Sequence, residues 1–387
     1  MKRVLVVLKS SYKKYQTDSR VQRQVRTLCD RGFTVTVLLV DNPRNMPKPG
    51  TLPYETVCVD LPGFWSSKGA SRIKQMWLQV RYFLKAKKCI KSLNPDVLIM
   101  NDVNTLVFSR SKAGLKIYDS HELWYDLVEY HGYVRGRFGR WLFKSIEKRY
   151  SKDVDAFITV NDSMAEFLGK RLGKRFHVIR NVPLIEESDR IDIRKSNGLP
   201  NTTFIIVHSG SISENRGLNE LGQLITRLYK EEVRNVSFVL YGIDKGTMKR
   251  LRMMCTKDAL KQHRFHGPLS QKELYSTLKT ADLGILLTKN TNLNNYHSLP
   301  NKLFEYLMNG LPVICSDFPE MRTLIEKYDV GWLVNPENTE DVNAAITQAH
   351  TDSSMLRKYK ENTTRLTGDI SFKQEMGILV ELIEASH

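Results

Sequence analysis

The feature that most constrains the fold of this chain is a regular alternation of short apolar runs with amphipathic segments. Five apolar runs in the first half predict β-strands, at residues 3–8, 33–40, 96–100, 116–118 and 156–160. The pattern between the first two runs predicts a helix over residues 21–31 that ends at Gly32. Strands that alternate with helices form parallel sheets with helices on both faces, so we predict an α/β fold.

The same alternation starts again in the second half. Four apolar runs predict strands at residues 204–208, 236–241, 283–287 and 313–316, and three patterns predict helices at residues 218–229, 271–280 and 303–309. A polar segment separates the halves, and a length of 387 residues suits two domains. We therefore predict two tandem Rossmann-like, doubly wound domains, residues 1–183 and residues 202–368, joined by a linker at residues 184–201.

Positive charge is concentrated in the first half. Residues 1–183 contain 34 Lys and Arg against 16 Asp and Glu, whereas residues 184–387 contain 25 against 26. Residues 71–93 and 133–149 are strongly basic and carry aromatic side chains. Basic amphipathic helices with aromatics are typical of membrane-surface binding, although an ordinary solvated helix gives the same pattern. We expect an anionic membrane surface as a partner, and no nucleic acid, because the known nucleic-acid-binding motifs are absent.

Several protein classes do not fit the sequence. The five cysteines contain no C-x-x-C pair, which disfavours a disulfide framework or a zinc site. The apolar run that Lys9 ends is shorter than a signal-peptide core, and no stretch is long enough for a membrane span. We expect a cytoplasmic protein, and the basic segments leave open a peripheral association with the inner face of the membrane. The G-x-G-x-x-G and P-loop sequences that would indicate a nicotinamide dehydrogenase or a P-loop NTPase are missing.

A candidate phosphate loop follows the first strand of the second half. Gly210 allows a backbone to approach a ligand, and Gly217 opens the helix at residues 218–229, whose N-terminus favours an anion. Arg216 adds a forked positive charge that matches a phosphate. An ordinary turn with a surface arginine would give the same sequence.

A second candidate segment lies at residues 297–314. Pro300 suits the start of a helix and Gly310 its end. The backbone N–H groups of Asn301 and Lys302 are suited to a phosphate, and the Glu305 carboxylate is suited to both hydroxyls of a ribose. A solvated helical glutamate is the alternative for Glu305.

Together these segments resemble the donor site of retaining GT-B-fold glycosyltransferases of family four, of the type that builds bacterial surface polysaccharides. The segments that carry the resemblance are residues 300–306, 310–314, 211–218, 265–270, 17–21, 101–106 and 118–124. The resemblance implies a GT-B fold with two domains facing across a cleft and a last helix, residues 369–387, that returns to the first domain. It also implies transfer of a sugar, with retention of configuration, from a nucleoside-diphosphate sugar to a glycan or lipid-linked acceptor.

The resemblance assigns roles to particular residues. The donor-binding set is Gly210, Ser211, Arg216, Gly217, His266, Gly267, His297, Pro300, Asn301, Lys302, Leu303 and Glu305. The acceptor-side set is Asp18, Ser19, Arg20, Asp119 and Glu122. The catalytic set is His121, Arg216 and Lys302. We expect Arg216, Lys302 and two helix N-termini to stabilise the departing diphosphate, so that no metal and no cofactor is needed, and the resemblance implies that His121 contacts the donor sugar.

Two positions depart from the family pattern. His297 stands eight residues before Glu305, where a first glutamate is usual, and Ser211 stands where the loop usually has arginine. Lys302 is then a candidate to replace the missing phosphate contact.

Two other interpretations stay open. One keeps the fold but changes the reaction, to a nucleotide-sugar epimerase or a sugar phosphorylase. The other is a non-catalytic protein that binds polyanions, for which replacing Glu305 would leave binding unaffected.

Overall fold

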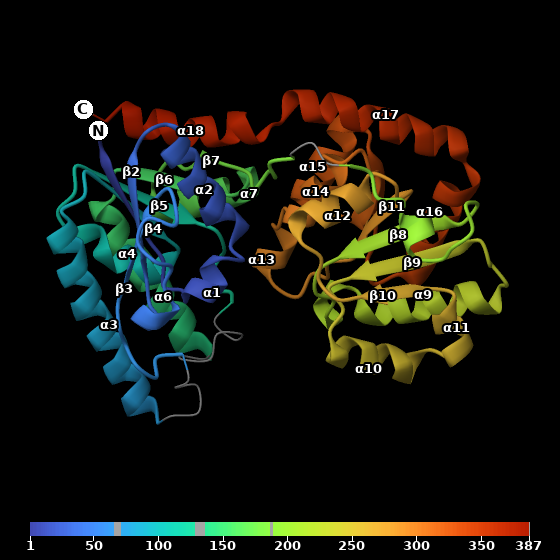
Figure 1. The fold of residues 1–387 in the computed structure, drawn as a ribbon, viewed down its shortest axis with the longest axis horizontal. Helices are drawn as coiled ribbons and strands as arrows, with labels where there is room; N and C mark the ends of the chain where they lie inside the picture. Colours follow the sequence, from blue (N-terminus) through green and yellow to red (C-terminus); the bar gives the residue numbers. More distant parts are fainter. Residues whose placement is uncertain (66–70, 128–135, 186–188, 387) are drawn as a thin grey trace. The chain divides into compact units, whose positions relative to one another are not determined.

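A computed structural model describes residues 1–65, 71–127, 136–185 and 189–386 of the chain. The chain divides into two compact units, which Figure 1 shows with their elements labelled. The first unit contains Met1–Arg180 and Lys373–His387, and the second contains Asn181–Phe372. The start of the second basic segment, residues 133–135, lies outside the described residues.

The first unit is built on a seven-stranded parallel sheet with the order β3-β2-β1-β4-β5-β6-β7. Its strands are β1 (Arg3–Val7), β2 (Thr34–Leu39), β3 (Glu55–Cys58), β4 (Val97–Asn101), β5 (Leu115–Ser120), β6 (Ala156–Thr159) and β7 (His177–Val178). The central strands β1 and β4 are apolar along nearly their whole length, because helices cover both faces of a parallel sheet. The order reverses between β1 and β4, the place where doubly wound sheets bind ligands.

Helices cover both faces of this sheet, with α3 and α6 on one face and α2 and α18 on the other (Figure 1). The helices of this unit are α1 (Tyr12–Tyr15), α2 (Ser19–Asp30), α3 (Arg72–Leu93), α4 (Val103–Leu106), α6 (Gly136–Tyr150), α7 (Asp162–Leu172) and α18 (Phe372–Glu384). Among its described residues are the short 3-10 turns η1 (Pro43–Asn45), η3 (Val107–Arg110) and η4 (Ser151–Asp153). Helix α3 buries one stripe, Leu78, Tyr82, Ala86 and Ile90, at a spacing of four residues.

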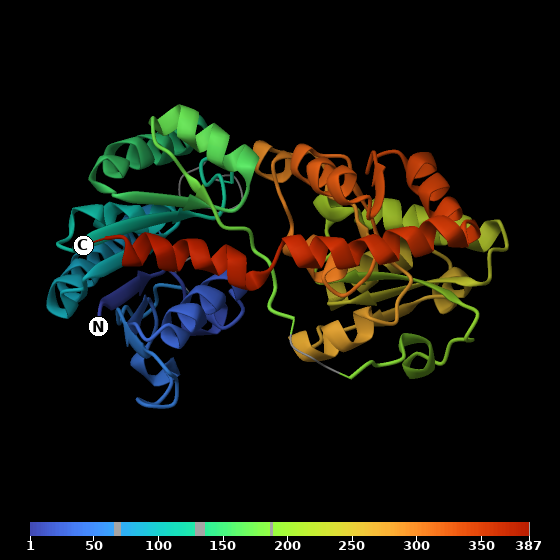
Figure 2. The same ribbon diagram turned by 90° about the horizontal axis from the view of Figure 1, so that it is seen from above.

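The last helix of the chain belongs to the first unit, as the sequence predicted. Helix α18 lies along this unit near α2 and α7 (Figure 2). The Lys2 Nζ donates to the Ile383 carbonyl at 2.7 Å, and the Arg180 backbone N–H donates to the Glu375 carboxylate at 2.6 Å. The first unit therefore includes a helix from the end of the sequence, held by these contacts.

The second unit contains a six-stranded parallel sheet with the order β10-β9-β8-β11-β12-β13. Its strands are β8 (Phe204–Ser209), β9 (Val236–Tyr241), β10 (Arg264–His266), β11 (Leu283–Leu286), β12 (Val313–Ser316) and β13 (Gly331–Val334). The order reverses between β8 and β11, which pair through Leu283 with Ile206 and Gly284 with Val207. This reversal marks the expected ligand-binding edge of the second sheet.

Two apolar cores lie on the two faces of this sheet. Helices α12, α14 and α15 pack on one face, and α9, α10, α11 and α16 on the other. The helices are α8 (Ile193–Ser196), α9 (Leu218–Lys230), α10 (Lys245–Met254), α11 (Lys257–Lys261), α12 (Gln271–Leu278), α13 (Leu293–Tyr296), α14 (Asn301–Leu307), α15 (Pro319–Tyr328), α16 (Thr339–Thr351) and α17 (Ser353–Asp369), with the 3-10 turn η5 (Glu214–Arg216). These two sheets confirm the predicted pair of doubly wound domains.

The segment at residues 184–201 packs against the second unit in its described part. Ile193 is fully buried in the core of that unit. The Arg194 guanidinium donates to the Thr203 carbonyl at 2.8 Å and to the Thr280 carbonyl at 3.0 Å. This segment is thus an ordered edge of the second unit.

Candidate active site

A loop of residues 210–217 follows β8 at the point where the order of the second sheet reverses. Its two glycines have φ angles of +85° at Gly210 and +80° at Gly217, a region that favours glycine. A Cβ at Gly210 would lie 3.0 Å from the Lys302 Nζ, and one at Gly217 would lie 2.6 Å from the Leu287 Cβ. The positive φ favours glycine at both positions, and at Gly217 the Leu287 Cβ also leaves no room for a side chain.

Arg216 presents its side chain at the surface of this loop. Its Nη1 donates to the Ser211 hydroxyl at 3.1 Å, so the serine that replaces the usual arginine orients the remaining one. Helix α9 begins directly afterwards, and no side chain caps its first turn. Uncapped N–H groups beside a guanidinium form a site that favours an anion.

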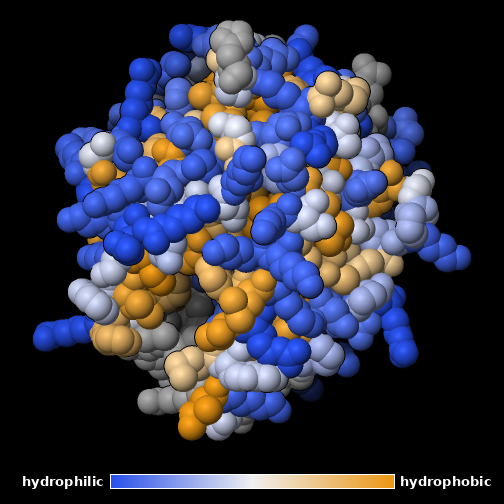
Figure 3. Space-filling model, turned by 90° about the vertical axis from the view of Figure 1, so that its left-hand side faces the viewer, coloured by the Kyte–Doolittle hydropathy of each residue, from blue (hydrophilic) through white to orange (hydrophobic). Residues whose placement is uncertain are grey.

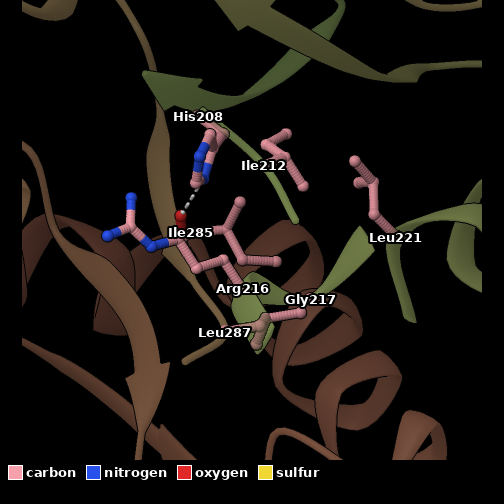
Figure 4. Close-up of a pocket in the computed structure, with 7 residues that line it drawn as sticks. All are labelled: His208, Ile212, Arg216, Gly217, Leu221, Ile285 and Leu287. Atoms are coloured by element: carbon pink, nitrogen blue, oxygen red, sulfur yellow. Dashed lines mark hydrogen bonds between the residues drawn. The ribbon is translucent and has the colours of Figure 1, made fainter. Parts of the chain in front are cut away.

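Lys302 brings a second cation to the same loop from α14. Its Nζ lies 3.2 Å from the Nε2 of His208, a buried residue of β8. Burial and the neighbouring Arg216 lower the pKa of Lys302 to about 7, although Glu305 acts in the opposite direction. The pocket below the loop is lined by His208, Arg216 and mainly apolar side chains, which Figure 4 labels.

Helix α14 holds the loop in place through its buried face. The Tyr306 hydroxyl accepts from the backbone N–H of Ser209 at 2.8 Å, and Tyr306 is fully buried. Leu303 is fully buried as well, so its side chain serves the core. Pro300 forms the N-cap of α14, and Glu305 is half-buried on the same helix as Lys302.

The remaining predicted donor residues lie around this loop and helix. Asn301 accepts a hydrogen bond from Asn181 at 2.5 Å, and His297 ends α13 with its ring 5.2 Å from that of Tyr296. The spacing to Glu305 therefore places an aromatic imidazole where the family pattern has a carboxylate.

His266 is the last residue of β10, which pairs with β9, and Gly267 follows it. The His266 ring stacks on Tyr241, with centroids 5.1 Å apart, and its Nε2 lies 2.6 Å from the Asn197 Oδ1. Burial and Arg264 lower the pKa of His266, so its ring is neutral near pH 7. Gly267 is exposed, and a flat neutral ring beside an exposed backbone suits a stacked base.

In the first unit, His121 follows β5 and lies between two carboxylates. Its Nε2 is 3.2 Å from Asp119, its Nδ1 is 3.8 Å from Asp102, and its backbone N–H donates to Asp102 at 3.0 Å. Asp102 has a φ of +62°, a strained conformation for a residue other than glycine. The strained residue, Asp102, follows β4 and contacts His121, the residue predicted to be catalytic.

These carboxylates decide the charge of His121. Burial disfavours the imidazolium, but Asp119 and Asp102 outweigh it and raise the pKa of His121 to about 9. Burial would also keep Asp119 neutral, yet Arg20 and His121 hold its pKa well below the usual range. At neutral pH His121 is therefore a cation that donates hydrogen bonds and does not accept a proton.

The predicted acceptor-side residues divide into buried and accessible ones. Arg20 pairs with Asp119 at 2.8 Å and donates to the Ile179 carbonyl at 2.6 Å, and the two side chains are only 3% and 0% exposed. In this structure Arg20 and Asp119 therefore orient His121 from below. Asp18 caps α2 by accepting from the Val21 N–H at 3.2 Å, Ser19 begins the same helix, and Glu122 is exposed.

The sequence contains one D-x-D motif, Asp153-Val154-Asp155. Asp153 pairs with Arg110 at 3.1 Å, and Asp155 accepts from the Lys116 N–H at 2.8 Å, just before β6 begins. The motif thus stands at the amino end of the sheet, away from the carboxyl ends where the candidate residues lie. Within the described residues, no group of three or more His, Cys, Asp or Glu is arranged to hold a metal ion.

Sequence reasoning missed two basic groups at strand ends. His208 lies within a run that was assigned only to a strand. Lys9 follows β1 and lies over the rings of Phe64 and Tyr82, at 5.9 Å and 5.6 Å from their centroids, where burial lowers its pKa to about 8. Both residues stand at the carboxyl end of a strand, β8 or β1, and this position could have indicated them as candidates.

Two family models match the chain. Residues 19–182 match the model described as Glycosyltransferase Family 4, and residues 189–366 match the model described as Glycosyl transferases group 1. A chitobiosyldiphosphodolichol beta-mannosyltransferase of Candida albicans is 25% identical over 66% of this chain and 58% of its own length. A putative colanic acid biosynthesis glycosyl transferase, WcaI, of Escherichia coli is 28% identical over 46% of this chain and 44% of its own length. The chain thus spans about half the length of these curated relatives.

Solved structures share the fold over essentially the whole chain. The sucrose-phosphate synthase of Thermosynechococcus elongatus superposes with a TM-score of 0.77 at 14% identity, covering 100% of both chains. WaaG, a glycosyltransferase involved in lipopolysaccharide biosynthesis, has a TM-score of 0.70 at 15% identity and covers 99% of this chain and 100% of its own. Together with the two doubly wound sheets, these neighbours define the fold as GT-B. The chain belongs to glycosyltransferase family four.

Proposed function

We propose that this protein transfers a sugar from a nucleoside-diphosphate sugar to a lipid-linked glycan, with retention of configuration and without a metal ion. The observation that carries the proposal is the pair of cations, Arg216 and Lys302, on a glycine loop at the start of α9. A diphosphate needs concentrated positive charge and free backbone N–H groups, and this loop offers both.

The names of the relatives support the classes of donor and acceptor. The Candida relative is named for a dolichol-diphosphate-linked disaccharide, and WcaI for the biosynthesis of a polysaccharide. Anabaena Alr3699/HepE, which shares the fold with a TM-score of 0.71 at 15% identity over 100% of both chains, was solved in complex with UDP-glucose. For this chain we infer a nucleoside-diphosphate donor and a lipid-linked acceptor.

The chemistry requires stabilisation of a leaving group. As the bond from the sugar to the diphosphate breaks, negative charge grows on the diphosphate and positive charge on the sugar. Arg216, Lys302 and the N-terminus of α9 would stabilise that negative charge, and Glu305 would accept the ribose hydroxyls. The new bond forms to an acceptor oxygen, whose proton passes to the departing diphosphate.

The donor site is tested by thermal shift with UDP, GDP and ADP. A ligand that binds only the native state at about 100 times its Kd stabilises it by about 2.7 kcal/mol, so we expect one of these nucleotides to raise the Tm by several degrees. Glu305→Ala should abolish most of the rise, whereas Glu337→Ala, at an exposed position, should keep it. The rise should be equal with magnesium and with EDTA.

Three results would contradict the parts of this proposal separately. If no nucleotide raises the Tm, the proposed donor site is wrong. If the Tm rises only when magnesium is present, the metal-free mechanism is wrong. The configuration of the product, read by NMR from its anomeric proton, tests retention. An inverted product would contradict it and would agree with the β-linkage in the name of the Candida relative.

We also propose that the first unit binds an anionic membrane through α3. Five large apolar side chains on this helix are 52–76% exposed: Ile73, Met76, Trp77, Val80 and Leu84. Their spacing of three, four and seven residues places this α3 stripe on one side of the helix, opposite the stripe that is buried in the core. On α6, Phe138 and Trp141 are also exposed and stack on each other at 5.7 Å.

Basic side chains accompany the α3 stripe. Arg81 lies over the Trp77 ring at 4.4 Å from its centroid, and α3 contains six further Lys and Arg and no acidic residue. Figure 3 shows apolar side chains in orange among hydrophilic ones in blue on this side of the molecule. An exposed apolar stripe with a basic surround suits the boundary between lipid headgroups and acyl chains. No described helix is both long and apolar enough to cross a membrane.

Membrane binding is tested by co-sedimentation with vesicles. The protein should bind phosphatidylglycerol-containing vesicles more tightly than phosphatidylcholine alone, and raised salt should weaken this binding. Trp77→Ser combined with Val80→Ser should weaken it about tenfold or more, because two inserted side chains are lost. Met253→Ser, at a 77% exposed position on α10, is the matched control. If the double variant binds vesicles as tightly as Met253→Ser, the α3 stripe does not contact the membrane.

A further inference from the structure

His208 is a buried histidine at the carboxyl end of β8 to which the proposed mechanism gives no task. Its side chain is 5% exposed, and both of its ring nitrogens have polar neighbours. The Nδ1 lies 3.0 Å from the Ile285 carbonyl of β11, a contact that Figure 4 marks with a dashed line. The Nε2 lies 3.2 Å from the Lys302 Nζ.

These two contacts fix the tautomer of His208. A carbonyl oxygen only accepts and an ammonium only donates, so beside the Ile285 carbonyl and a charged Lys302 the neutral ring has its proton on Nδ1 and its lone pair on Nε2; the backbone of Ser211 also hydrogen-bonds the ring. That lone pair accepts a hydrogen bond from Lys302, whether the amine is charged or neutral. Burial, together with Lys302 and Arg216, lowers the pKa of His208 well below its usual range, so the ring stays neutral throughout the working pH range.

Because the His208 ring is neutral, it can hold the Lys302 amine in place without neutralising its charge. A carboxylate in place of His208 would fix Lys302 but would also neutralise it and compete with a phosphate. The imidazole fixes the Nζ over Gly210 and leaves its charge available for a ligand. The charged groups that act on Lys302 are Arg216 from the loop and Glu305 from α14, and the net effect with burial is a pKa of about 7.

We propose that His208 is a positioning residue that holds the Lys302 amine at the loop as a proton-linked contact for a diphosphate, so that the protein takes up a proton when the donor binds. A diphosphate beside Lys302 favours the ammonium form and therefore raises the pKa of the bound amine. Above pH 7 the free amine is largely neutral, so binding draws a proton from solution, and affinity falls as the pH rises. Below pH 6 the amine is already charged, so affinity there is independent of pH.

The test uses UDP-glucose and GDP-mannose, because a sugar nucleotide lacks the terminal phosphate that titrates near pH 6 in a free nucleotide. Isothermal titration calorimetry at pH 8, in two buffers of different ionisation enthalpy, counts the protons exchanged. We expect uptake of close to one proton and a Kd that rises several-fold between pH 7 and pH 8.5. Lys302→Met should bind more weakly, without proton uptake and without this pH dependence.

Two substitutions at His208 separate its role from a purely structural one. The amide of Gln reaches the place of Nε2, and the amide of Asn reaches the place of Nδ1. His208→Asn keeps the Ile285 contact and loses Lys302, so we expect about tenfold weaker binding at pH 6.5, where the lost hydrogen bond would have involved a charged group. His208→Gln keeps an acceptor for Lys302 and should bind within about threefold of the wild type, with proton uptake preserved.

The outcomes distinguish this inference from the proposed function, on which its diphosphate ligand rests. If neither sugar nucleotide binds the wild type, although circular dichroism shows it folded, both fail together. If one binds with no proton uptake and with a constant Kd from pH 6 to pH 9, only the role of Lys302 and His208 is overturned. Equal weakening by His208→Asn and His208→Gln would likewise reduce His208 to a structural residue.

Discussion

Arg216→Ala should lower kcat/KM for sugar transfer by about 10²- to 10³-fold, mostly through kcat. The guanidinium lies at the surface of the loop, bonded to Ser211 and beside the uncapped start of α9. Charge on the diphosphate is largest in the transition state, so a fixed cation contributes more there than in the bound donor. The measurement is the release of nucleoside diphosphate from the donor, with vesicles that carry lipid-linked glycans as acceptor.

Two controls make this expectation specific. Arg216→Lys keeps a charge but loses the fork, so it should recover part of the rate. Arg250→Ala removes an exposed guanidinium that pairs with Glu214 of η5, at 3.0 Å, and should leave the rate nearly unchanged. If Arg216→Ala raised only KM, Arg216 would contribute to donor binding without a part in the chemical step.

Much of the fold followed from the sequence because parallel strands are buried on both faces. Strands such as β1, β4, β8 and β12 are continuous apolar runs, which are visible without knowledge of their partners. Two edge strands, β7 and β10, lack such a signal. β7 has only two residues and β10 has three, and both are intermediate in burial, so the pairing with a neighbour defines them and local composition does not.

The donor loop was predictable in its positions but not in its contacts. Gly210, Arg216 and Gly217 lie within one short stretch of the sequence, and their order already indicates a strand, a turn and a helix N-terminus. The contact of Lys302 with His208 joins residues 94 positions apart. It exists only because α14 packs across the end of β8, which no local pattern reports.

The same limit applies to the first unit. His121 and Asp119 are neighbours in the sequence, yet Arg20, which pairs with Asp119, is 99 positions away. The sequence placed Arg20 and Asp119 on the acceptor side, and the structure buries both. A charged pair at the carboxyl end of a strand can serve a ligand or another side chain, and the packing of α2 on the sheet selects the second use here.

Asp119→Asn should therefore lower stability as strongly as any single change in the first unit. The substitution leaves the Arg20 guanidinium buried without its carboxylate, and such a loss costs about 3–5 kcal/mol. For a unit of this size we expect the Tm to fall by about 10 °C. Asp96→Asn, which breaks the surface pair with Arg3, should change the free energy of unfolding by less than about 1 kcal/mol.

The pH dependence of the stability lost in Asp119→Asn shows whether Asp119 acts through its charge on His121 and Arg20 or only through packing. In the wild type the pKa of His121 rises on folding from 6.5 to about 9, so its contribution to stability is complete below pH 6.5 and is lost as the pH rises through 9. Without Asp119 most of that contribution disappears. The Tm difference between wild type and Asp119→Asn should then be largest at pH 6 and smaller at pH 10, where only the Arg20 part remains. A difference that stays constant across this range would show that Asp119 does not hold His121 in its charged form.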